Sequence, residues 1–244
     1  MLEINEIFGP TIQGEGKLVG SPSVFIRFGK CNFKCEGFAV EYETPRGVKK
    51  CACDTYYAVD TEFKDTWTKY KSYEEIVNEV DKLISIYPYN YKIDIVITGG
   101  EPLLYWNKEE FQKLLEHYIN AGHKVTIETN ASLNLNIDKE YQKELLFSMS
   151  VKLSNSLEPI KKRININTLN TILNNTKESY LKFVIGKDFL NDAKKEINEI
   201  LSLIPKCDVY LMPLGDTAEQ INKNCEDVIN MSIENGFKYC DRLH

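Results

Sequence analysis

The chain has 244 residues, of which 43% are hydrophobic and 27% are charged, and its formal net charge is −6. This length can bury a sizeable core and suits a single domain over residues 1–244. The negative charge argues against a nucleic-acid partner, because such binders need Lys and Arg to replace phosphate counterions. The N-terminal residues carry Glu3 and Glu6 without an apolar segment, and no apolar run is long enough to span a membrane. We therefore expect a cytoplasmic protein with no membrane partner.

Strand and helix patterns alternate along the chain. They predict a strand at residues 23–28, a helix over 73–87, a buried strand at 93–98 and a helix over 109–120, which Gly122 ends. Strands at 124–128, 149–153 and 180–185 follow, then a helix over 192–203, a strand at 208–212 and a helix over 218–235. Repeated strand–helix units predict an α/β fold, a partial (β/α)6-type barrel of parallel strands. In such barrels the chemistry lies at the C-terminal ends of the strands.

Two segments interrupt this alternation. Residues 36–50 lie between cysteines and show no clean period, so they are expected to form an inserted loop. Residues 155–175 are rich in Asn, Ser and Lys and predict a loop with a short helix.

Four of the seven cysteines lie within residues 31–53, namely Cys31, Cys35, Cys51 and Cys53. The other three are isolated and are interpreted as small core residues: Cys207, Cys225 and Cys240. A chain without a secretion signal should keep its thiols reduced, so the cluster needs another explanation than disulfides. Thiolates are soft ligands, suited to zinc or to iron–sulfur clusters.

The spacing of the four cysteines leaves several interpretations open. Structural zinc normally takes four ligands in two close pairs, often with two residues inside each pair. Here three residues lie inside one pair and one inside the other, so zinc remains an alternative, as do four unliganded thiols. An iron–sulfur cluster held by three thiolates would leave one iron open for the amino and carboxylate groups of S-adenosylmethionine. Electron transfer into the sulfonium then releases a carbon radical, which side chains alone cannot do.

The pair Cys31 and Cys35, directly after the strand at 23–28, resembles the start of the radical S-adenosylmethionine superfamily signature, Cys-x3-Cys-x2-Cys. The chain departs from it because residues 36–52 precede Cys53, which leaves Cys51 and Cys53 as candidates for the third ligand. The run TGGEP at residues 98–102 resembles the superfamily's GGEP motif, whose backbone holds the amino group of S-adenosylmethionine. Taken alone, a Gly-Gly pair after a strand is also an ordinary turn.

The run IFGPTIQGEG at residues 7–16, together with FIRF at 25–28, resembles the 7-carboxy-7-deazaguanine synthase family of the queuosine precursor pathway. In that family a Cys-Asp-Thr or Cys-Asp-Ser run carries the third cysteine, which favours Cys53 over Cys51. The resemblance continues through residues 128–130, 150–152, 182–184 and 242–244. Family members commonly continue several residues further, and some have an enlarged cluster loop, which fits an insertion at about residues 36–52.

The resemblance implies a radical enzyme that converts 6-carboxy-5,6,7,8-tetrahydropterin to 7-carboxy-7-deazaguanine with loss of ammonia. It implies a 4Fe–4S cluster, S-adenosylmethionine and Mg²⁺ as cofactors. It also implies an external electron donor, such as a flavodoxin or ferredoxin, and a homodimer.

The resemblance further implies the site residues. Cys31, Cys35 and Cys53 would hold the cluster, and Thr55 would offer its hydroxyl to Mg²⁺, which prefers oxygen ligands. Arg27 would pair with the substrate carboxylate, since its guanidinium matches two oxygens. The remaining positions divide by ligand. S-adenosylmethionine would be lined by Ala52, Cys53, Asp54, Gly100, Ser150, Val151 and Lys152, and the pterin by Ile12, Gln13, Gly14 and Thr98.

Arg27 also stands out from the residue pattern itself. Strand alternation puts Phe25 and Arg27 on one face of the strand, and Val24, Ile26 and Phe28 on the other. A charge inside a core strand is costly unless it is paired. We therefore expect an inward guanidinium that lacks a protein partner and awaits the substrate carboxylate, with a structural ion pair as the alternative.

Two other classes of protein compete with this interpretation. A glycyl-radical-enzyme activase would share the cysteine and GGEP features but would lack the IQGEG run joined to a strand that carries Arg. A non-enzymatic zinc-binding module would bind zinc and no iron.

Overall fold

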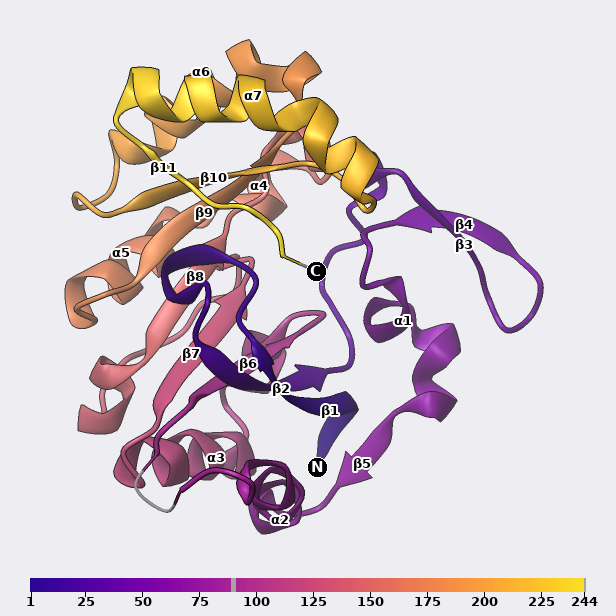
Figure 1. Cartoon of the computed structure of the whole chain (residues 1–244), viewed down its shortest axis with the longest axis vertical. Helices are drawn as coiled ribbons and strands as arrows, with labels where there is room; N and C mark the ends of the chain where they lie inside the picture. The colour runs from indigo at the N-terminus through magenta and orange to yellow at the C-terminus, as the bar shows by residue number, and fades with distance from the viewer. Residues whose placement is uncertain (89–90, 244) are drawn as a thin grey trace.

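The protein is described by a computed structural model that places residues 1–88 and 91–243. A nine-stranded sheet forms its centre, in the order β11-β10-β9-β8-β7-β6-β2-β1-β5, and a two-stranded sheet of β3 and β4 stands beside it. Figure 1 shows the large sheet curving around a central space, with helices outside it and the C-terminal segment inside.

Six parallel strands form the greater part of the large sheet and follow one another in chain order. They are β2 (Pro22–Phe28), β6 (Asp94–Gly99), β7 (Lys124–Thr129), β8 (Leu146–Ser150), β9 (Tyr180–Ile185) and β10 (Val209–Pro213). A short parallel strand, β11 (Lys238–Tyr239), extends the sheet beyond β10. This arrangement confirms the predicted α/β fold with a partial (β/α)6-type barrel.

Two antiparallel strands that the sequence did not predict complete the sheet. β1 (Leu2–Ile12) pairs with β2, and β5 (Thr68–Tyr70) pairs with β1. Glu3, Glu6 and the Gly9–Pro10 pair interrupt the apolar alternation in β1, so its periodicity is weak. The strand predicted at residues 23–28 is therefore second in the chain.

Five helices lie on the outer side of the sheet in Figure 1: α2 (Tyr73–Ile84), α3 (Glu109–Asn120), α5 (Ile166–Asn175), α6 (Leu190–Leu201) and α7 (Ala218–Asn235). α3 and α7 have the predicted bounds, while α2 and α6 end a few residues earlier than predicted. Only a 3-10 turn (Glu140–Glu144) joins β7 to β8, so that unit lacks an α-helix. Within the described residues, no helix is long and apolar enough to cross a membrane.

The strand predicted at residues 149–153 is displaced to β8, three residues earlier. Val151 and Leu153 continue the apolar alternation, which made the later register attractive in the sequence. The backbone leaves the sheet at this point, because the Val151 amide donates to the Met149 carbonyl at 2.9 Å in a tight turn. Both side chains nevertheless join the apolar core.

The insertion between the cysteines is a hairpin rather than an irregular loop. β3 (Val40–Glu43) and β4 (Lys49–Ala52) pair antiparallel, and the short helix α1 (Tyr56–Val59) follows. The rings of Tyr42 and Tyr56 stack with centroids 4.2 Å apart, which joins the hairpin to α1. The second interrupting segment contains two helices, α4 (Ile160–Arg163) and α5, instead of the one predicted.

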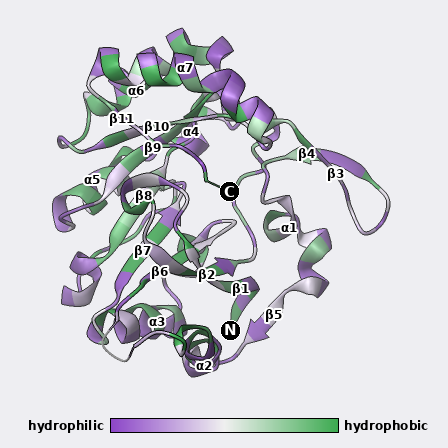
Figure 2. Cartoon of the chain, in the orientation of Figure 1, coloured by the Kyte–Doolittle hydropathy of each residue, from purple (hydrophilic) through white to green (hydrophobic). Residues whose placement is uncertain are grey.

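Along the strands, hydrophobic residues are interspersed with hydrophilic ones, shown green and purple in Figure 2. The outer face of the sheet is apolar, and the inner face is more polar. Outward side chains enter one large core under the helices, for example Ile26, Ile97, Ile127 and Phe183. Inward side chains at the C-terminal ends of the same strands are polar or charged: Arg27, Thr98, Glu128, Ser150 and Lys182.

Candidate active site

A cavity of about 370 Å³ lies on the inner face, at the C-terminal ends of the strands. Most of the predicted site residues line it, although they come from distant parts of the chain. They are Gln13, Arg27, Cys31, Cys35, Cys53, Asp54, Thr55, Thr98, Gly100, Ser150 and Lys152.

Four predicted residues do not line the cavity: Ile12, Gly14, Ala52 and Val151. The side chain of Ile12 is exposed, whereas those of Ala52 and Val151 are buried. The carbonyl of Gly14 accepts a hydrogen bond from the Leu243 amide at 3.2 Å. Any role of these positions in ligand binding would therefore fall to their backbone groups.

The three predicted cluster ligands gather at one side of the cavity. Cys35 has a left-handed backbone (φ 53°), which turns the chain sharply after Cys31. A carboxylate from across the site fixes this turn, because Glu158 accepts hydrogen bonds from the amides of Lys34 (2.6 Å) and Cys35 (3.1 Å). Cys51 is not a lining residue, and its Sγ contacts the Glu36 carbonyl at 3.5 Å.

The thiols that line the cavity interact electrostatically. Burial raises the pKa of Cys31, and both Cys35 and Cys53 raise it further. Burial also raises the pKa of Cys35 to about 12, which Lys152 opposes with its positive charge and Cys53 reinforces. Without a metal, the thiols of Cys31 and Cys35 are therefore neutral, and loading iron would release their protons.

The thiols do not form a compact site for a single metal ion among the described residues. In the part of the chain that the structure describes, no three His, Cys, Asp or Glu residues are arranged to hold one metal ion. A tetrahedral zinc site with bonds of about 2.3 Å would bring its sulfurs within roughly 3.8 Å of one another. An iron–sulfur cluster is a larger body and accepts more widely spaced thiolates.

The Gly-Gly pair is required by the packing of the backbone as well as by any ligand. Gly99 has φ +136°, and a Cβ at Gly99 or Gly100 would lie 2.1 Å from the carbonyl oxygen of Phe28 or Lys30, respectively. Two hydrogen bonds hold this contact, since the Gly100 amide donates to Phe28 and the Glu101 amide to Lys30. The turn after β6 is thereby connected to the start of the cysteine loop, the segment of residues 29–55 that follows β2 and carries Cys31, Cys35 and Cys53.

A buried polar clamp lies beneath the cysteine loop. Glu101 is fully buried and accepts hydrogen bonds from the Thr129 hydroxyl (2.6 Å) and the Asn130 amide (2.7 Å). The Asn130 side chain donates to Asn32 Oδ1 at 3.0 Å, next to Cys31. Glu101, Thr129 and Asn130 therefore position the cysteine loop. This gives a structural role to residues of two matched runs, the one at 98–102 and the one at 128–130.

Arg27 points into the cavity, as the strand alternation predicted, but it does have a protein partner. Its Nε donates to Glu6 Oε1 at 2.7 Å, and the guanidinium carbon lies 5.5 Å from the ring centroid of Phe8. The expectation of an unpaired charge was wrong, because β1, which the sequence did not predict, supplies the carboxylate. No further hydrogen bond of the guanidinium is found among the described residues, so its terminal amino groups can still receive an anion.

A second carboxylate, Glu128, faces the cavity from β7. The Thr98 hydroxyl donates to Glu128 Oε2 at 2.7 Å, and Gln13 Nε2 donates to Oε1 at 3.4 Å. The side-chain oxygen of Gln13 also accepts from the Glu15 amide at 3.1 Å. Thr98 and Gln13 therefore orient Glu128 before any ligand arrives.

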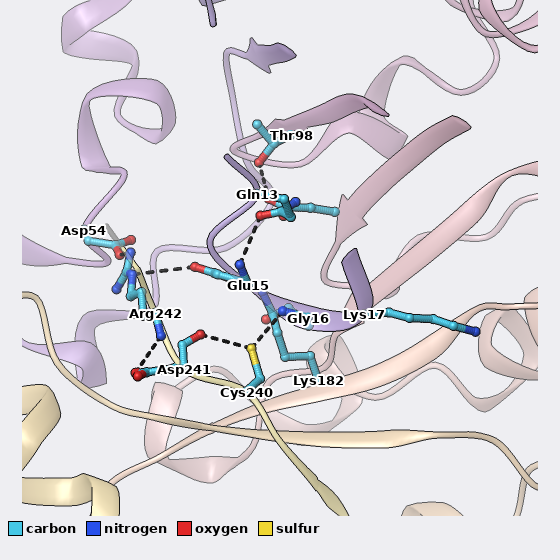
Figure 3. Close-up of polar contacts among 12 residues, drawn as sticks. Gln13, Glu15, Gly16, Lys17, Asp54, Thr98, Lys182, Cys240, Asp241 and Arg242 are labelled. Atoms are coloured by element: carbon cyan, nitrogen blue, oxygen red, sulfur yellow. Dashed lines mark hydrogen bonds and ion pairs between the residues drawn. The ribbon is translucent and has the colours of Figure 1, made fainter. Parts of the chain in front are cut away.

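Two of the charged residues lining the cavity, Glu15 and Arg242, had no predicted role of their own. Glu15 pairs with the buried Lys182, and Arg242 pairs with both Glu15 and Asp54 (Figure 3). Both residues lie in runs that match the family, Glu15 at 7–16 and Arg242 at 242–244, but no local sequence pattern predicts that they pair. His244, the last matched position, lies outside the described residues.

The fold and the cysteine-lined cavity define a class of protein. The radical SAM superfamily model matches residues 26–228, so the chain belongs to this superfamily, whose members use a 4Fe–4S cluster and S-adenosylmethionine. The crystal structure of QueE from Escherichia coli has the same fold, with a TM-score of 0.64 and 19% identity over 100% of this chain and 94% of that one. SuiB from Streptococcus suis is similar over 91% of this chain and 48% of its own (TM-score 0.53, 14% identity).

Sequence relatives narrow the assignment further. The 7-carboxy-7-deazaguanine synthase of Clostridium acetobutylicum is 31% identical over 84% of this chain and 78% of its own. That of Halobacterium salinarum is 29% identical over 100% of this chain and 89% of its own. The chain therefore belongs to the 7-carboxy-7-deazaguanine synthase family, and these relatives do not favour the activase or the zinc module.

Proposed function

We propose that the protein converts 6-carboxy-5,6,7,8-tetrahydropterin to 7-carboxy-7-deazaguanine with loss of ammonia. The observation that carries this proposal is the composition of one cavity. In a chain of this family, Cys31, Cys35 and Cys53 face the same 370 Å³ space as an inward Arg27 and Glu128.

Cys31, Cys35 and Cys53 would hold the cluster, which supplies the electron that cleaves S-adenosylmethionine into a radical. The chain's own residues bind and orient the cofactor beside it. Ser150 and Gly100 line that side of the cavity, and Lys152 Nζ is held 2.8 Å from Ser150 Oγ. Lys152 places a positive charge near the cysteine loop, which favours the thiolate form of Cys35.

The other side of the cavity suits a carboxylated pterin. Glu6 orients the Arg27 guanidinium through Nε, which leaves the terminal amino groups to bind the substrate carboxylate. Glu128 is oriented by Thr98 and can accept hydrogen bonds from ring N–H groups of a bound heterocycle. The parallel rings of Phe8 and Phe25, 4.9 Å apart, line this side and exclude water.

Thr55 is our candidate ligand for Mg²⁺. Its hydroxyl lies in the cavity, 3.4 Å from Cys53 Sγ, at the start of α1. Mg²⁺ keeps several waters and commonly takes only one or two protein ligands plus substrate oxygens, so a single hydroxyl is compatible with this role.

The wider setting is also part of the proposal. An external one-electron donor such as a flavodoxin or ferredoxin would reduce the cluster, and the family resemblance supports a homodimer in the cytoplasm. Residues 1–244 would act as one domain, with the hairpin of β3 and β4 as an insertion.

The test is turnover by protein purified and reconstituted anaerobically. With S-adenosylmethionine, a reductant, Mg²⁺ and the carboxylated pterin, we expect 7-carboxy-7-deazaguanine and ammonia in equal amounts. A brown protein that cleaves S-adenosylmethionine but leaves the pterin unchanged would contradict the substrate assignment while keeping the superfamily chemistry.

A further inference from the structure

We propose that Arg242 is a positioning residue that ties the turn at residues 13–16 to the cysteine loop at Asp54, so that the two sides of the cavity are held in register. The predicted effect on catalysis rests on the proposed function, whereas the link that Arg242 makes between Glu15 and Asp54 does not.

The C-terminal segment, residues 240–243, holds the turn at three successive residues. The Leu243 amide donates to the Gly14 carbonyl at 3.2 Å, Arg242 Nε lies 3.5 Å from Glu15 Oε1, and the Gly16 amide contacts Cys240 Sγ at 2.8 Å. The segment is itself anchored to the sheet, because the Cys240 amide donates to the Leu211 carbonyl at 2.9 Å. The turn is therefore fixed by a part of the chain that is remote in sequence.

Arg242 reaches both sides of the cavity at once. Figure 3 shows its guanidinium between Glu15 of the turn and Asp54, the residue that follows Cys53. Its Nη1 also donates to the Gly215 carbonyl after β10, at 3.0 Å. Burial alone would lower the pKa of Arg242, but Asp54 and Glu15 outweigh this effect and raise it. The guanidinium therefore remains charged and paired in a half-buried place.

The turn has little freedom to adapt if this pairing is lost. Glu15 is held from the other side by the buried Lys182. Gly16 has φ +68°, and a Cβ there would lie 2.0 Å from Tyr180 Oη. When Arg242 is removed, Glu15 keeps its pairing with Lys182, whereas Asp54 loses its pairing with Arg242. The turn, as a unit, and the segment at Asp54 are therefore expected to move more freely relative to one another.

The two ends of this tie serve different ligands of the proposed reaction. Gln13, in the turn, orients Glu128 on the pterin side, and Asp54 adjoins the third cluster cysteine on the cofactor side. The link should couple cleavage of S-adenosylmethionine to conversion of the pterin, because cleavage is productive only when the pterin is correctly bound. Loss of the tie should allow cleavage without product.

The first test measures amide hydrogen exchange in the metal-free protein, which does not depend on activity. Arg242→Gln should increase exchange several-fold both in the peptide of residues 13–18 and in that of residues 53–59. Arg242→Lys keeps the charge and should show a smaller increase. Arg46→Gln, the same change at an exposed hairpin position, is the matched control and should alter neither peptide.

Asp54→Asn tests the tie from its other end, and it also serves if Arg242→Gln does not fold. It should increase exchange in residues 13–18, which are remote from position 54 in sequence. Increased exchange confined to residues 236–243 in Arg242→Gln, or an unchanged turn in Asp54→Asn, would overturn the proposal.

The second test counts S-adenosylmethionine cleaved per pterin converted by the loaded enzyme. Arg242→Gln should raise this ratio several-fold and Arg242→Lys less, whereas a merely structural defect would lower both rates together. If the parent protein does not convert the pterin, the proposed function fails, and the exchange measurement still decides whether Arg242 joins the two loops.

Discussion

The two faces of the same six strands follow different rules. On the outer face, Ile26, Ile97 and Phe183 are fully buried in one apolar core under the helices. On the inner face, the neighbouring positions Arg27, Thr98 and others carry charge or hydroxyl groups around a cavity. The outer face is stabilised by the apolar area that it removes from water, whereas the inner charges depend on specific hydrogen-bond and ion-pair partners.

Within each strand, the outward residues therefore contribute mainly to the stability of the fold, and the inward residues at the cavity contribute mainly to its chemistry. β9 is the clearest case, since Phe183 packs outward in the core while Lys182 pairs inward with Glu15. An outer substitution should therefore change the free energy of unfolding, whereas a substitution of a residue that lines the cavity should mainly change what the cavity binds. The following predictions test that separation, beginning with the largest expected effect.

Phe183→Ala should destabilise the protein by about 3–5 kcal/mol, because it leaves a cavity in the outer core. Urea unfolding followed by circular dichroism would measure the loss. Ile233→Ala, at a position on α7 that is 74% exposed, is the control and should change the free energy by less than about 0.5 kcal/mol. A Phe183→Ala variant as stable as the parent would show that the outer face does not carry the fold.

Arg27→Ala should weaken binding of the carboxylated pterin by roughly 2–5 kcal/mol, as for a buried charge pair that loses one partner. Arg27→Lys keeps the charge but loses the two-pronged geometry, so it should also impair binding. Calorimetric titration of the loaded protein would measure both affinities, and its iron content should not change. Parent-like affinity in Arg27→Ala would mean that Arg27 serves only to neutralise Glu6.

Asp94 provides an inner-face charge away from the cysteines. Burial raises its pKa to about 7, although the Thr126 hydroxyl, 2.8 Å away, opposes the shift. Because the pKa of Asp94 is higher in the folded state than in the unfolded state, its contribution to stability is greatest below about pH 4 and is lost as the pH rises to about 7. At about 1.4 kcal/mol per pKa unit, the loss is on the order of a few kcal/mol.

Asp94→Asn should remove this pH dependence, because the amide does not titrate in this range. Unfolding free energies of both proteins between pH 4 and 8 would show whether the slope of the parent flattens in the variant. Identical slopes would rule out Asp94 as its source.

Thr55→Ala should have the smallest effect, a weaker stimulation of turnover by Mg²⁺, because water can replace one hydroxyl ligand. Turnover titrated with Mg²⁺ after chelation would measure the change. Thr66→Ala, outside the cavity lining, is the control. If the chelated parent is fully active without added Mg²⁺, the magnesium proposal fails.

The outer face could be predicted from the sequence because its signals are local. The periods of residues 109–120 and 218–235 gave the bounds of α3 and α7, and apolar runs gave β6 and β9 nearly to the residue. The alternation in β2 also correctly placed Arg27 and Phe25 on the inner face. These features depend on residues close together in the chain.

The inner face could be predicted only in part, because its partners come from distant segments. The motif resemblance identified residues that line the cavity, but not the ion pair of Arg27 with Glu6, which needs the antiparallel β1. Nor could any local pattern join Glu15 to Lys182 and Arg242. The hairpin of β3 and β4 was missed because each strand has only four residues and is mostly half-buried or exposed, which is too short for a clear apolar period.

The most direct test of the cavity as a three-thiolate site compares Cys53→Ser with Cys51→Ser. Both proteins would be purified anaerobically and measured for iron content, visible absorbance and cleavage of S-adenosylmethionine. Cys53 lines the cavity with Cys31 and Cys35 whereas Cys51 does not, so Cys53→Ser should lose cleavage and most of its iron. Cys51→Ser should retain both. The opposite result, with cluster and cleavage retained in Cys53→Ser and lost in Cys51→Ser, would contradict the account.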